Sequence, residues 1–270
     1  MNIATNTATT REVVILLLIG AAAGVMSGLL GVGGGIVMIP LMTALLGLTQ
    51  HKAHGTSLAV IVFTAIAGAF TYGWKGHTDL FIATELAIGS IVGARIGALT
   101  MNRIPARELR MIFGGFIFLV GLRMIAPMPH SLAVIDVRTV AGFVVIVVLG
   151  LITGFLSGIL GVGGGIVMVP AMVLLLGMAQ QDAQGISLLV IIPTSIVGAM
   201  THLRKGNVVT HIVPWIALTS IFAAIVGSSL ALGPFKSVLQ QLFGVFLLVV
   251  SVQMVYTARK QPAQAIKAAK

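Results

Sequence analysis

The chain has 270 residues, of which 58% are hydrophobic and only 8% are charged. A water-soluble domain carries about 25% charged residues, so this composition excludes a soluble globular protein and predicts a polytopic membrane protein, because apolar segments of about 20 residues recur along the chain. The net charge of +10 is scattered between apolar segments, which argues against nucleic-acid binding, and the lack of cysteine excludes disulfides and thiolate chemistry.

Five apolar helices are predicted in the first half of the chain, at about 12–30, 35–48, 52–73, 79–101 and 107–126. The first is expected to be a retained helix and not a cleaved signal peptide, because it has no small-residue cleavage site and leads directly into a glycine-rich loop. The second has fourteen residues and reaches about 21 Å, which is less than the ~30 Å of the hydrocarbon core. At least one of its ends is therefore predicted to lie within the membrane.

The second half of the chain repeats the first at an offset of 130 residues without a gap, so that Gly31 falls on Gly161 and Pro40 on Pro170. Internal duplication of this kind is typical of secondary transporters. We predict a single all-α polytopic transporter domain, 1–270, with about ten helical segments in two tandem homologous halves. Its parts are a first repeat at 11–126, a linker at 127–140, a second repeat at 141–256 and a basic tail at 257–270.

Five segments per half is an odd number, which predicts that the halves are inverted relative to each other. The basic residues agree with this prediction. Lys52 has no basic counterpart in the second half, whereas Lys75 corresponds to a loop with two, Arg204 and Lys205. If the basic tail is cytoplasmic, the richer loop of each pair is cytoplasmic as well. A parallel arrangement of four plus four helices, with the short helices as re-entrant hairpins, leaves the asymmetry unexplained, so we expect an inverted 5+5 arrangement with both termini cytoplasmic.

The most distinctive motif is GVGGG, which lies inside two fourteen-residue stretches that share twelve identical positions. Irregular backbone at membrane depth is tolerated only where it lines a cavity or is buried in protein. Each motif also leads into a helix N-terminus, which attracts anions. The two loops predict a midplane anion site built from Gly33, Gly34, Gly35, Gly163, Gly164 and Gly165. The alternative is that the glycines only allow close helix packing.

Polar side chains near the predicted start of the third helix of each repeat are candidates to complete this anion site. They are His54, Thr56 and Ser57 in the first repeat, and Gln184 and Ser187 in the second. Their alternative roles are helix capping and contact between helices.

Two charged residues inside the fourth predicted helix are candidates for a transport role. Arg95 is a candidate oxyanion ligand, although an arginine about 9 Å from a helix end can also extend to the headgroups. Glu85 is the candidate for proton coupling, and its alternative is a pair with a hydroxyl of another helix or with Arg123. His51 and His54 lack a third metal ligand, so neither a metal site nor a cofactor is predicted.

Three segments together resemble the TauE/SafE family of sulfite-exporter-like permeases: GVGGGIVMIP, AHGTSLAVI, and the run from GARIGA to RIPARELRMIFGG. The second copy supplies GVGGGIVMVP and AQGISLLVI. The resemblance covers nearly the whole chain and implies secondary transport of small sulfur-containing or carboxylate-like anions across the bacterial inner membrane. Ile186 replaces the threonine of GTSL in the second copy, so the two half-sites are not chemically equivalent.

We therefore expect a multi-pass anion transporter of the bacterial inner membrane, acting on sulfite, a sulfonate or a related anion. The expected mechanism is alternating access, with one half rocking against the other around the site between the glycine loops. A metal or other cation transporter and a passive anion channel are the alternatives. An enzyme is not expected, because no nucleophile and base stand together at membrane depth. The exact substrate, the coupling ion and a homodimer stay open.

Overall fold

The computed structural model of the chain describes residues 10–100, 106–126, 139–160 and 163–260, and all regular structure within these ranges is helical. The helices are α1 (Thr10–Leu30), α2 (Gly35–Leu45), α3 (Gln50–Trp74), α4 (Leu80–Thr100), α5 (Ala106–Ile125), α6 (Val140–Leu160), α7 (Gly165–Leu175), α8 (Gln180–Arg204), the 3₁₀ turn η1 (Thr210–Ile212), α9 (Val213–Leu232) and α10 (Leu239–Lys260). Seven of them are long and apolar enough to cross a membrane. The all-α polytopic fold predicted from the sequence is confirmed.

The short second helix of each repeat is shorter than predicted. α2 and α7 have eleven residues each, about 16 Å at ~1.5 Å per residue. Each stops before a glycine with left-handed backbone, Gly47 at φ 63° and Gly177 at φ 64°, a conformation that commonly ends helices. The fourth helices also differ: the Asp79 carboxylate accepts from the backbone N–H of Phe81 and starts α4, whereas Val209 in the second repeat has no such side chain and a 3₁₀ turn precedes α9.

The two repeats are inverted relative to each other. The equivalent helices α3 and α8 pack together, and a Cβ atom at Gly68 would lie 2.8 Å from the Leu188 side chain, while one at Gly198 would lie 3.0 Å from that of Leu58. Because position 58 corresponds to 188 and 68 to 198, each helix presents its early residue to the late residue of the other. The helices are therefore antiparallel and related by a pseudo-two-fold axis, as the odd number of segments predicts.

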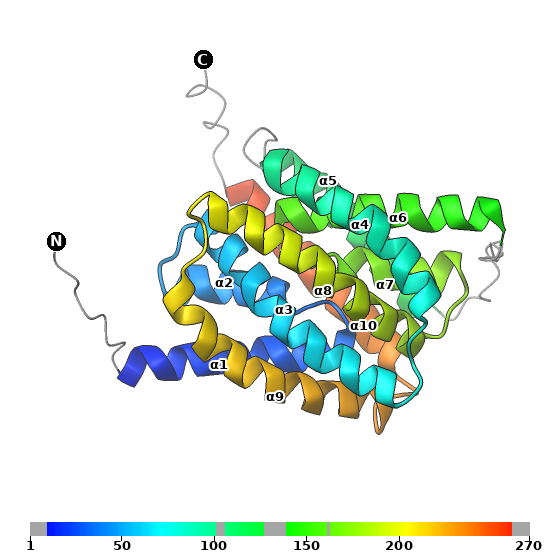
Figure 1. Cartoon of the computed structure of the whole chain (residues 1–270), viewed down its shortest axis with the longest axis horizontal. Helices are drawn as coiled ribbons and strands as arrows, with labels where there is room; N and C mark the ends of the chain where they lie inside the picture. The colour runs from blue at the N-terminus through cyan, green and yellow to red at the C-terminus, as the bar shows by residue number, and fades with distance from the viewer. Residues whose placement is uncertain (1–9, 101–105, 127–138, 161–162, 261–270) are drawn as a thin grey trace, which may run out of the picture.

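The helices of the two repeats are interlocked. Glycines of α1 pack on the backbone of α9, and glycines of α6 pack on that of α4. Figure 1 shows α1 and α9 side by side. A Cβ at Gly28 would lie 2.1 Å from the carbonyl oxygen of Ala224, and one at Gly154 2.1 Å from that of Ser90. Small residues allow such close approach of membrane helices. The expectation that one repeat rocks against the other as a rigid body is therefore not compatible with this fold.

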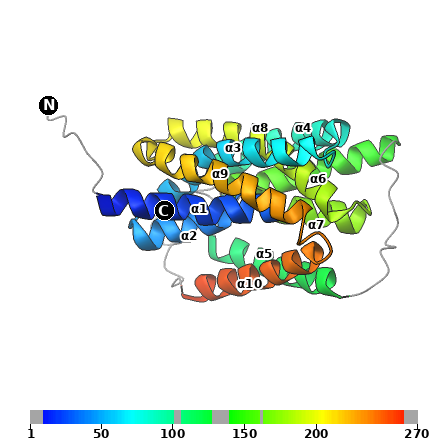
Figure 2. The ribbon, with the colours of Figure 1, turned by 90° about the horizontal axis from the view of Figure 1, so that it is seen from below.

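A third pair, α5 with α10, lies along one edge of the molecule (Figure 2). The two helices are antiparallel, and the Ser251 hydroxyl donates to the carbonyl oxygen of Gly114 at 2.7 Å. Phe113 and Phe243 of this pair belong to the same buried cluster as residues of α4, α6 and α7. A separate cluster joins α1, α2 and the start of α3 and α9. The α5–α10 pair is thus packed on the side of α7.

The loops divide between two opposite ends of the molecule. Both ends of the described chain lie at one end (Figure 1), which we call the terminal face, together with the start of α3 and the α8–α9 loop, where Gly55 approaches Asn207. At the opposite end, the linker face, the His77 ring bonds Asp182 at 2.7 Å. Lys205 lies at the terminal face and donates to the carbonyl oxygen of Ala98 at 2.7 Å. This arrangement agrees with the loop pairs that the basic residues predict.

Candidate functional site

The two glycine loops meet in the interior of the molecule. A Cβ at Gly163 would lie 3.1 Å from the carbonyl oxygen of Val32, and one at Gly165 would lie 2.6 Å from that of Gly31. Gly33, Gly34, Gly163 and Gly164 all have φ between 76° and 88°, a conformation that only glycine adopts readily. Side chains at Gly163 and Gly165 would push against the first loop, so the predicted meeting of the two motifs is present.

Both loops end at uncapped helix N-termini. Gly34 is the N-cap of α2 and Gly164 the N-cap of α7, and neither helix start receives a side-chain cap. Among the described residues, the backbone N–H groups of 33–36 have no hydrogen-bond acceptor. Free N–H groups at a helix start carry a partial positive charge and suit an anion. The glycines predicted as anion ligands thus stand at or beside two helix N-termini, and their role as ligands stays a prediction.

Three serine hydroxyls surround these helix starts. Ser27, Ser157 and Ser187 are at most 1% exposed, and their Oγ atoms have no hydrogen-bond partner within the described part of the chain. Ser187 Oγ lies 3.0 Å from where a Cβ of Gly165 would stand. Ser187 was a predicted ligand, whereas Ser27 and its counterpart Ser157 were missed, although both stand inside the duplicated stretch. Their repetition was the signal that would have identified them.

Two other predicted ligands have structural partners. Thr56 Oγ1 accepts from the backbone N–H of Val209 at 2.9 Å and fastens the α8–α9 loop to α3. Ser57 Oγ donates to the carbonyl oxygen of His54 at 2.8 Å. Neither is a helix cap, because α3 starts at Gln50 and is capped by Thr49. Thr56 is thus better described as a fastening residue than as an anion ligand.

Gln184 belongs to a closed hydrogen-bond network. Its Oε1 accepts from the Tyr72 hydroxyl at 2.8 Å, and its Nε2 donates to the carbonyl oxygen of Leu29 at 3.2 Å. The same hydroxyl lies 3.0 Å from the carbonyl oxygen of Gly28. Both Tyr72 and Gln184 are fully buried. The prediction that Gln184 binds the anion is therefore not supported. The hydroxyl of Tyr72, a residue that sequence reasoning missed, bonds the side-chain amide of Gln184 instead.

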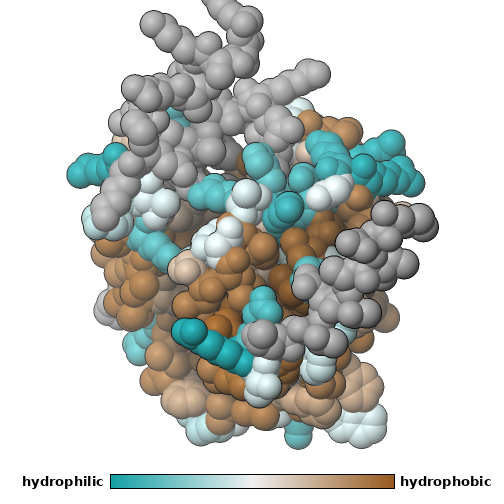
Figure 3. Space-filling view, turned by 90° about the vertical axis from the view of Figure 1, so that its left-hand side faces the viewer, coloured by the Kyte–Doolittle hydropathy of each residue, from teal (hydrophilic) through white to brown (hydrophobic). Residues whose placement is uncertain are grey.

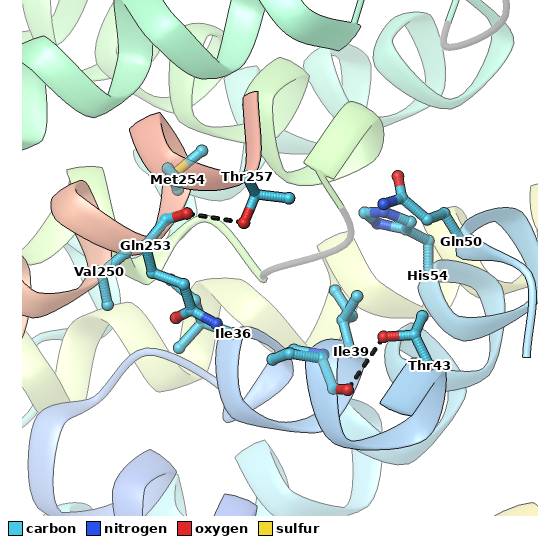
Figure 4. A pocket seen from close by; sticks show the side chains of 10 residues that line it. Ile36, Ile39, Thr43, Gln50, His54, Val250, Gln253, Met254 and Thr257 are labelled. Carbon is cyan, nitrogen blue, oxygen red and sulfur yellow. Dashed lines mark hydrogen bonds between the residues drawn. The ribbon is translucent and has the colours of Figure 1, made fainter. Parts of the chain in front are cut away.

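A cavity of about 150 Å³ lies between α2, α3 and α10. Figure 4 shows His54 and Gln50 on the α3 side, with Gln253 and Met254 projecting from α10. The lining also includes Ile36, in the first turn of α2, so the cavity connects to the start of that helix. It lies toward the terminal face, where polar residues gather in Figure 3. His54, a predicted ligand, is therefore part of the cavity wall.

The equivalent region of the second repeat is closed. Ile39 and Thr43 of α2 are partly exposed, whereas their counterparts on α7, Val169 and Val173, are 0% and 3% exposed. The α5–α10 pair covers α7 through the shared buried cluster. In this structure the cavity beside the start of α2 therefore lies toward the terminal face.

The two charged candidates lie away from the loops. Arg95 is exposed on the face of α4 that also exposes Val92 and Ile96, so it does not join the site. Glu85 is buried at 5% exposure on α4, next to Leu86, whose carbonyl oxygen faces Gly150 of α6. The second glycine loop meets α6 further along, at Thr153.

No group of three or more His, Asp or Glu side chains that could hold a metal is found among the residues that the structure describes. His202, which sequence reasoning did not consider, is fully buried on α8 beside the start of α3. Only the contact across the two repeats brings it near His54, so local sequence contained no direct sign of it.

Comparisons with known proteins agree with the membrane-transport interpretation. The family model described as "Sulfite exporter TauE/SafE" matches residues 2–124 and 146–270. The chain is 31% identical over 217 residues to the "Probable membrane transporter protein YunE" of Bacillus subtilis, with 72% of this chain and 80% of that protein covered. It is 29% identical over 262 residues to a "Probable membrane transporter protein" of Xylella fastidiosa, with 92% and 97% covered.

Proposed function

The chain belongs to the sulfite exporter TauE/SafE family of membrane transporters, and we propose that it moves small oxyanions of the sulfite, sulfonate or carboxylate type by alternating access. The observation that carries this proposal is the meeting of two uncapped helix N-termini in the protein interior. Backbone N–H groups and serine hydroxyls donate hydrogen bonds without a formal charge. They bind an anion without holding it too tightly for release.

The substrate site is proposed to lie between the glycine loops, with the Ser27, Ser157 and Ser187 hydroxyls as further donors. Sulfite, sulfonates and small carboxylates all present charged oxygens to such donors, which is why the substrate is assigned as a class. A cation site would instead require several oxygen or nitrogen acceptors, whereas the two helix N-termini present backbone N–H donors to this position.

Alternating access is supported by the unequal exposure of the two repeats. The present structure exposes α2 to the cavity and buries α7. Exchanging the roles of the two inverted repeats would bury α2 and expose α7, which opens the site to the linker face. Because α1–α9 and α4–α6 are interlocked, the body proposed to move is the α5–α10 pair, which borders the cavity through α10 and covers α7 in this state.

The terminal face is proposed to be cytoplasmic, in a bacterial inner membrane. Lys52, Arg204 and Lys205 lie at this face, and cytoplasmic loops of membrane proteins are enriched in lysine and arginine. Both termini are then cytoplasmic, and the cavity of this structure is open to the cytoplasm.

The test of the anion site is a comparison of two serine variants. Ser187→Ala removes a buried hydroxyl without a partner among the described residues, while Ser251→Ala removes one that bonds within the α5–α10 pair. Thermal stabilisation by sulfite, methanesulfonate, thiosulfate and acetate is measured for both variants and for the unmodified chain. A hydrogen bond to a charged group contributes about 1.5–3 kcal/mol, so Ser187→Ala should weaken anion binding about 10- to 150-fold.

Ser251→Ala should bind the anion as the unmodified chain does. Stabilisation by a divalent metal ion and by none of the anions would contradict the proposal. Counterflow of the bound anion in proteoliposomes distinguishes a transporter from a passive channel, because only a transporter exchanges external labelled anion against internal anion and accumulates the label transiently.

A further inference from the structure

His202 is an unusual residue for the interior of this protein. It is 0% exposed, and neither ring nitrogen makes a hydrogen bond of good geometry to a described residue, although the backbone of Gly158 approaches the ring. Buried polar groups are normally paired, since an unpaired one loses its hydrogen bonds to water without replacement. An imidazole retained in this position therefore calls for a function.

The inverted repeat shows what stands opposite His202. Positions 202 and 72 are equivalent, and so are 54 and 184. A Cβ at Gly55 would lie 3.0 Å from His202 Cβ, and one at Gly185 would lie 3.0 Å from Tyr72 Cβ. The backbone around positions 54 and 202 is therefore arranged like the backbone around the equivalent positions 184 and 72. His202 and His54 occupy in one half the places that the hydrogen-bonded Tyr72 and Gln184 occupy in the other.

The two pairs differ in one chemical property. A tyrosine with a glutamine stays neutral around pH 7, because an unperturbed tyrosine titrates near pH 10. Two histidines can take up a proton between about pH 5 and 8. A neutral imidazole has one donor and one acceptor nitrogen, and a protonated one has two donors. The histidine pair is therefore the half of this repeated arrangement that can change its charge.

The histidine pair is also connected to the proposed anion pathway. His54 lines the cavity that includes Ile36 at the start of α2, whereas the Tyr72–Gln184 pair is fully buried. The other titratable groups that act on His202 are positive or neutral, namely Lys205 from the end of its own helix and His51 from α3. An anion in the cavity favours a protonated histidine pair, because opposite charges attract. Anion and proton should therefore bind together.

We propose that the His54–His202 pair is a proton-binding site that couples one proton to each anion carried. A hydronium ion at the terminal face gives up the proton, so that one of its O–H bonds breaks as one imidazole N–H bond forms, and a water molecule is left. This inference rests on the proposed anion transport and assigns its coupling ion. It replaces Glu85, which lies on α4 and is not part of the cavity lining, as the coupling residue.

The repeat itself supplies the variant that tests the proposal. The double variant His54→Gln with His202→Tyr rebuilds the Tyr72–Gln184 pair in the other half and leaves no imidazole. Thermal stabilisation by methanesulfonate and thiosulfate, which remain fully ionised, is measured from pH 5 to 8. The unmodified chain should bind the anion more tightly as pH falls, by up to about tenfold per pH unit while the pair titrates. The double variant should bind with an affinity that no longer depends on pH.

His77→Gln serves as the control, because His77 pairs with Asp182 at the linker face, and it should keep the pH dependence. A double variant that keeps the pH dependence would overturn the proposal. Should the double variant not fold, nuclear magnetic resonance of chain labelled with ¹⁵N-histidine gives the result, with His202→Gln used to assign the signal. A His202 signal that does not titrate between pH 5 and 8, or whose midpoint a bound anion leaves unmoved, overturns the coupling.

The two proposals fail differently. If no anion stabilises the unmodified chain at any pH, the anion site is wrong and the coupling falls with it. If anions stabilise the chain equally from pH 5 to 8, the anion site stands and only the proton coupling is wrong.

Discussion

At the scale of a single residue, Gly34 is required for two separate reasons, its backbone conformation and its close packing. Its φ of 76° is left-handed, and a Cβ would lie 2.6 Å from the carbonyl oxygen of Ala23. Gly47, just after the end of the same short helix, is required only for its backbone conformation. Its φ is 63°, but nothing lies within 4 Å of where its Cβ would be. The comparison separates backbone conformation from close packing at the proposed site.

Gly34→Ala is therefore expected to be more damaging than Gly47→Ala. Both variants lose about 1–2 kcal/mol for a side chain in left-handed backbone, but only Gly34→Ala must also move α1 away from the loop. We expect Gly47→Ala to bind anions with unchanged affinity and Gly34→Ala to lose most of its anion-dependent stabilisation. The measurement is the melting temperature of each variant with and without the anion. Equal losses in both variants would show that close packing of the loop is unimportant.

The packing of whole helices depends on rows of small residues that contact the backbone of the neighbouring helix. Gly89, Gly93 and Gly97 of α4 each face a carbonyl oxygen of α6 at 2.0–2.2 Å from where a Cβ would be. Hydroxyl pairs join the repeats at the same level, with Thr64 donating to Ser220 and Ser90 bonding Thr194, both at 2.8 Å. Since position 64 corresponds to 194 and 90 to 220, the two hydroxyl pairs are one contact repeated by the pseudo-two-fold axis.

Gly93→Ala is expected to destabilise the α4–α6 pair, because an added Cβ would lie 2.1 Å from the carbonyl oxygen of Leu151. Gly115→Ala provides a matched control in α5, where no atom lies within 4 Å and alanine is favoured over glycine in a helix by about 1 kcal/mol. Overpacking should lower the free energy of unfolding of Gly93→Ala by about 1–3 kcal/mol, so its melting temperature should fall clearly. The melting temperature of Gly115→Ala should stay level or rise. A Gly93→Ala variant as stable as the control would mean that the interface is looser than the structure shows.

The whole molecule is asymmetric although its two repeats are related by an axis. Thr43 and Gln253 line the cavity between α2 and α10, while their counterparts Val173 and Arg123 stand on α7 and α5. Val173 is 3% exposed. A movement of the α5–α10 pair from α7 toward α2 should shorten the distance between positions 43 and 253 and lengthen the distance between positions 173 and 123. The natural chain has no cysteine, so introduced cysteines carry labels at these sites alone.

Spin labels on Thr43→Cys with Gln253→Cys should report two distances, and a change of anion or pH should shift the balance between them. Labels on Val173→Cys with Arg123→Cys should show the opposite change under the same conditions. Leu18→Cys with Leu218→Cys, both on exposed positions of the interlocked α1 and α9, serve as the control and should keep one distance. If the distances in these two labelled pairs instead increased or decreased together, alternating access by movement of the α5–α10 pair would be contradicted.

Much of the fold was predictable because its signals are local or repeated. Apolar segments and their breaks placed the helices to within a few residues, and the basic loops indicated the inversion that α3 and α8 show. The errors at α2 and α7 came from Gly47 and Gly177, whose left-handed backbone ends each helix early. The glycine motif was correctly placed at a buried site, because irregular backbone in a membrane has few alternatives.

The partners of individual polar side chains were not predictable from the sequence. Thr56 bonds Val209, and Tyr72 bonds Gln184, across 153 and 112 residues of chain. The sequence alone determined the membrane class, the duplication and the position of the two glycine loops, because these follow from composition and from spacing along one chain. Only the tertiary structure decided that the repeats interlock, that Arg95 faces outward and that His202 stands opposite His54, because each depends on which distant segments the inverted packing brings into contact.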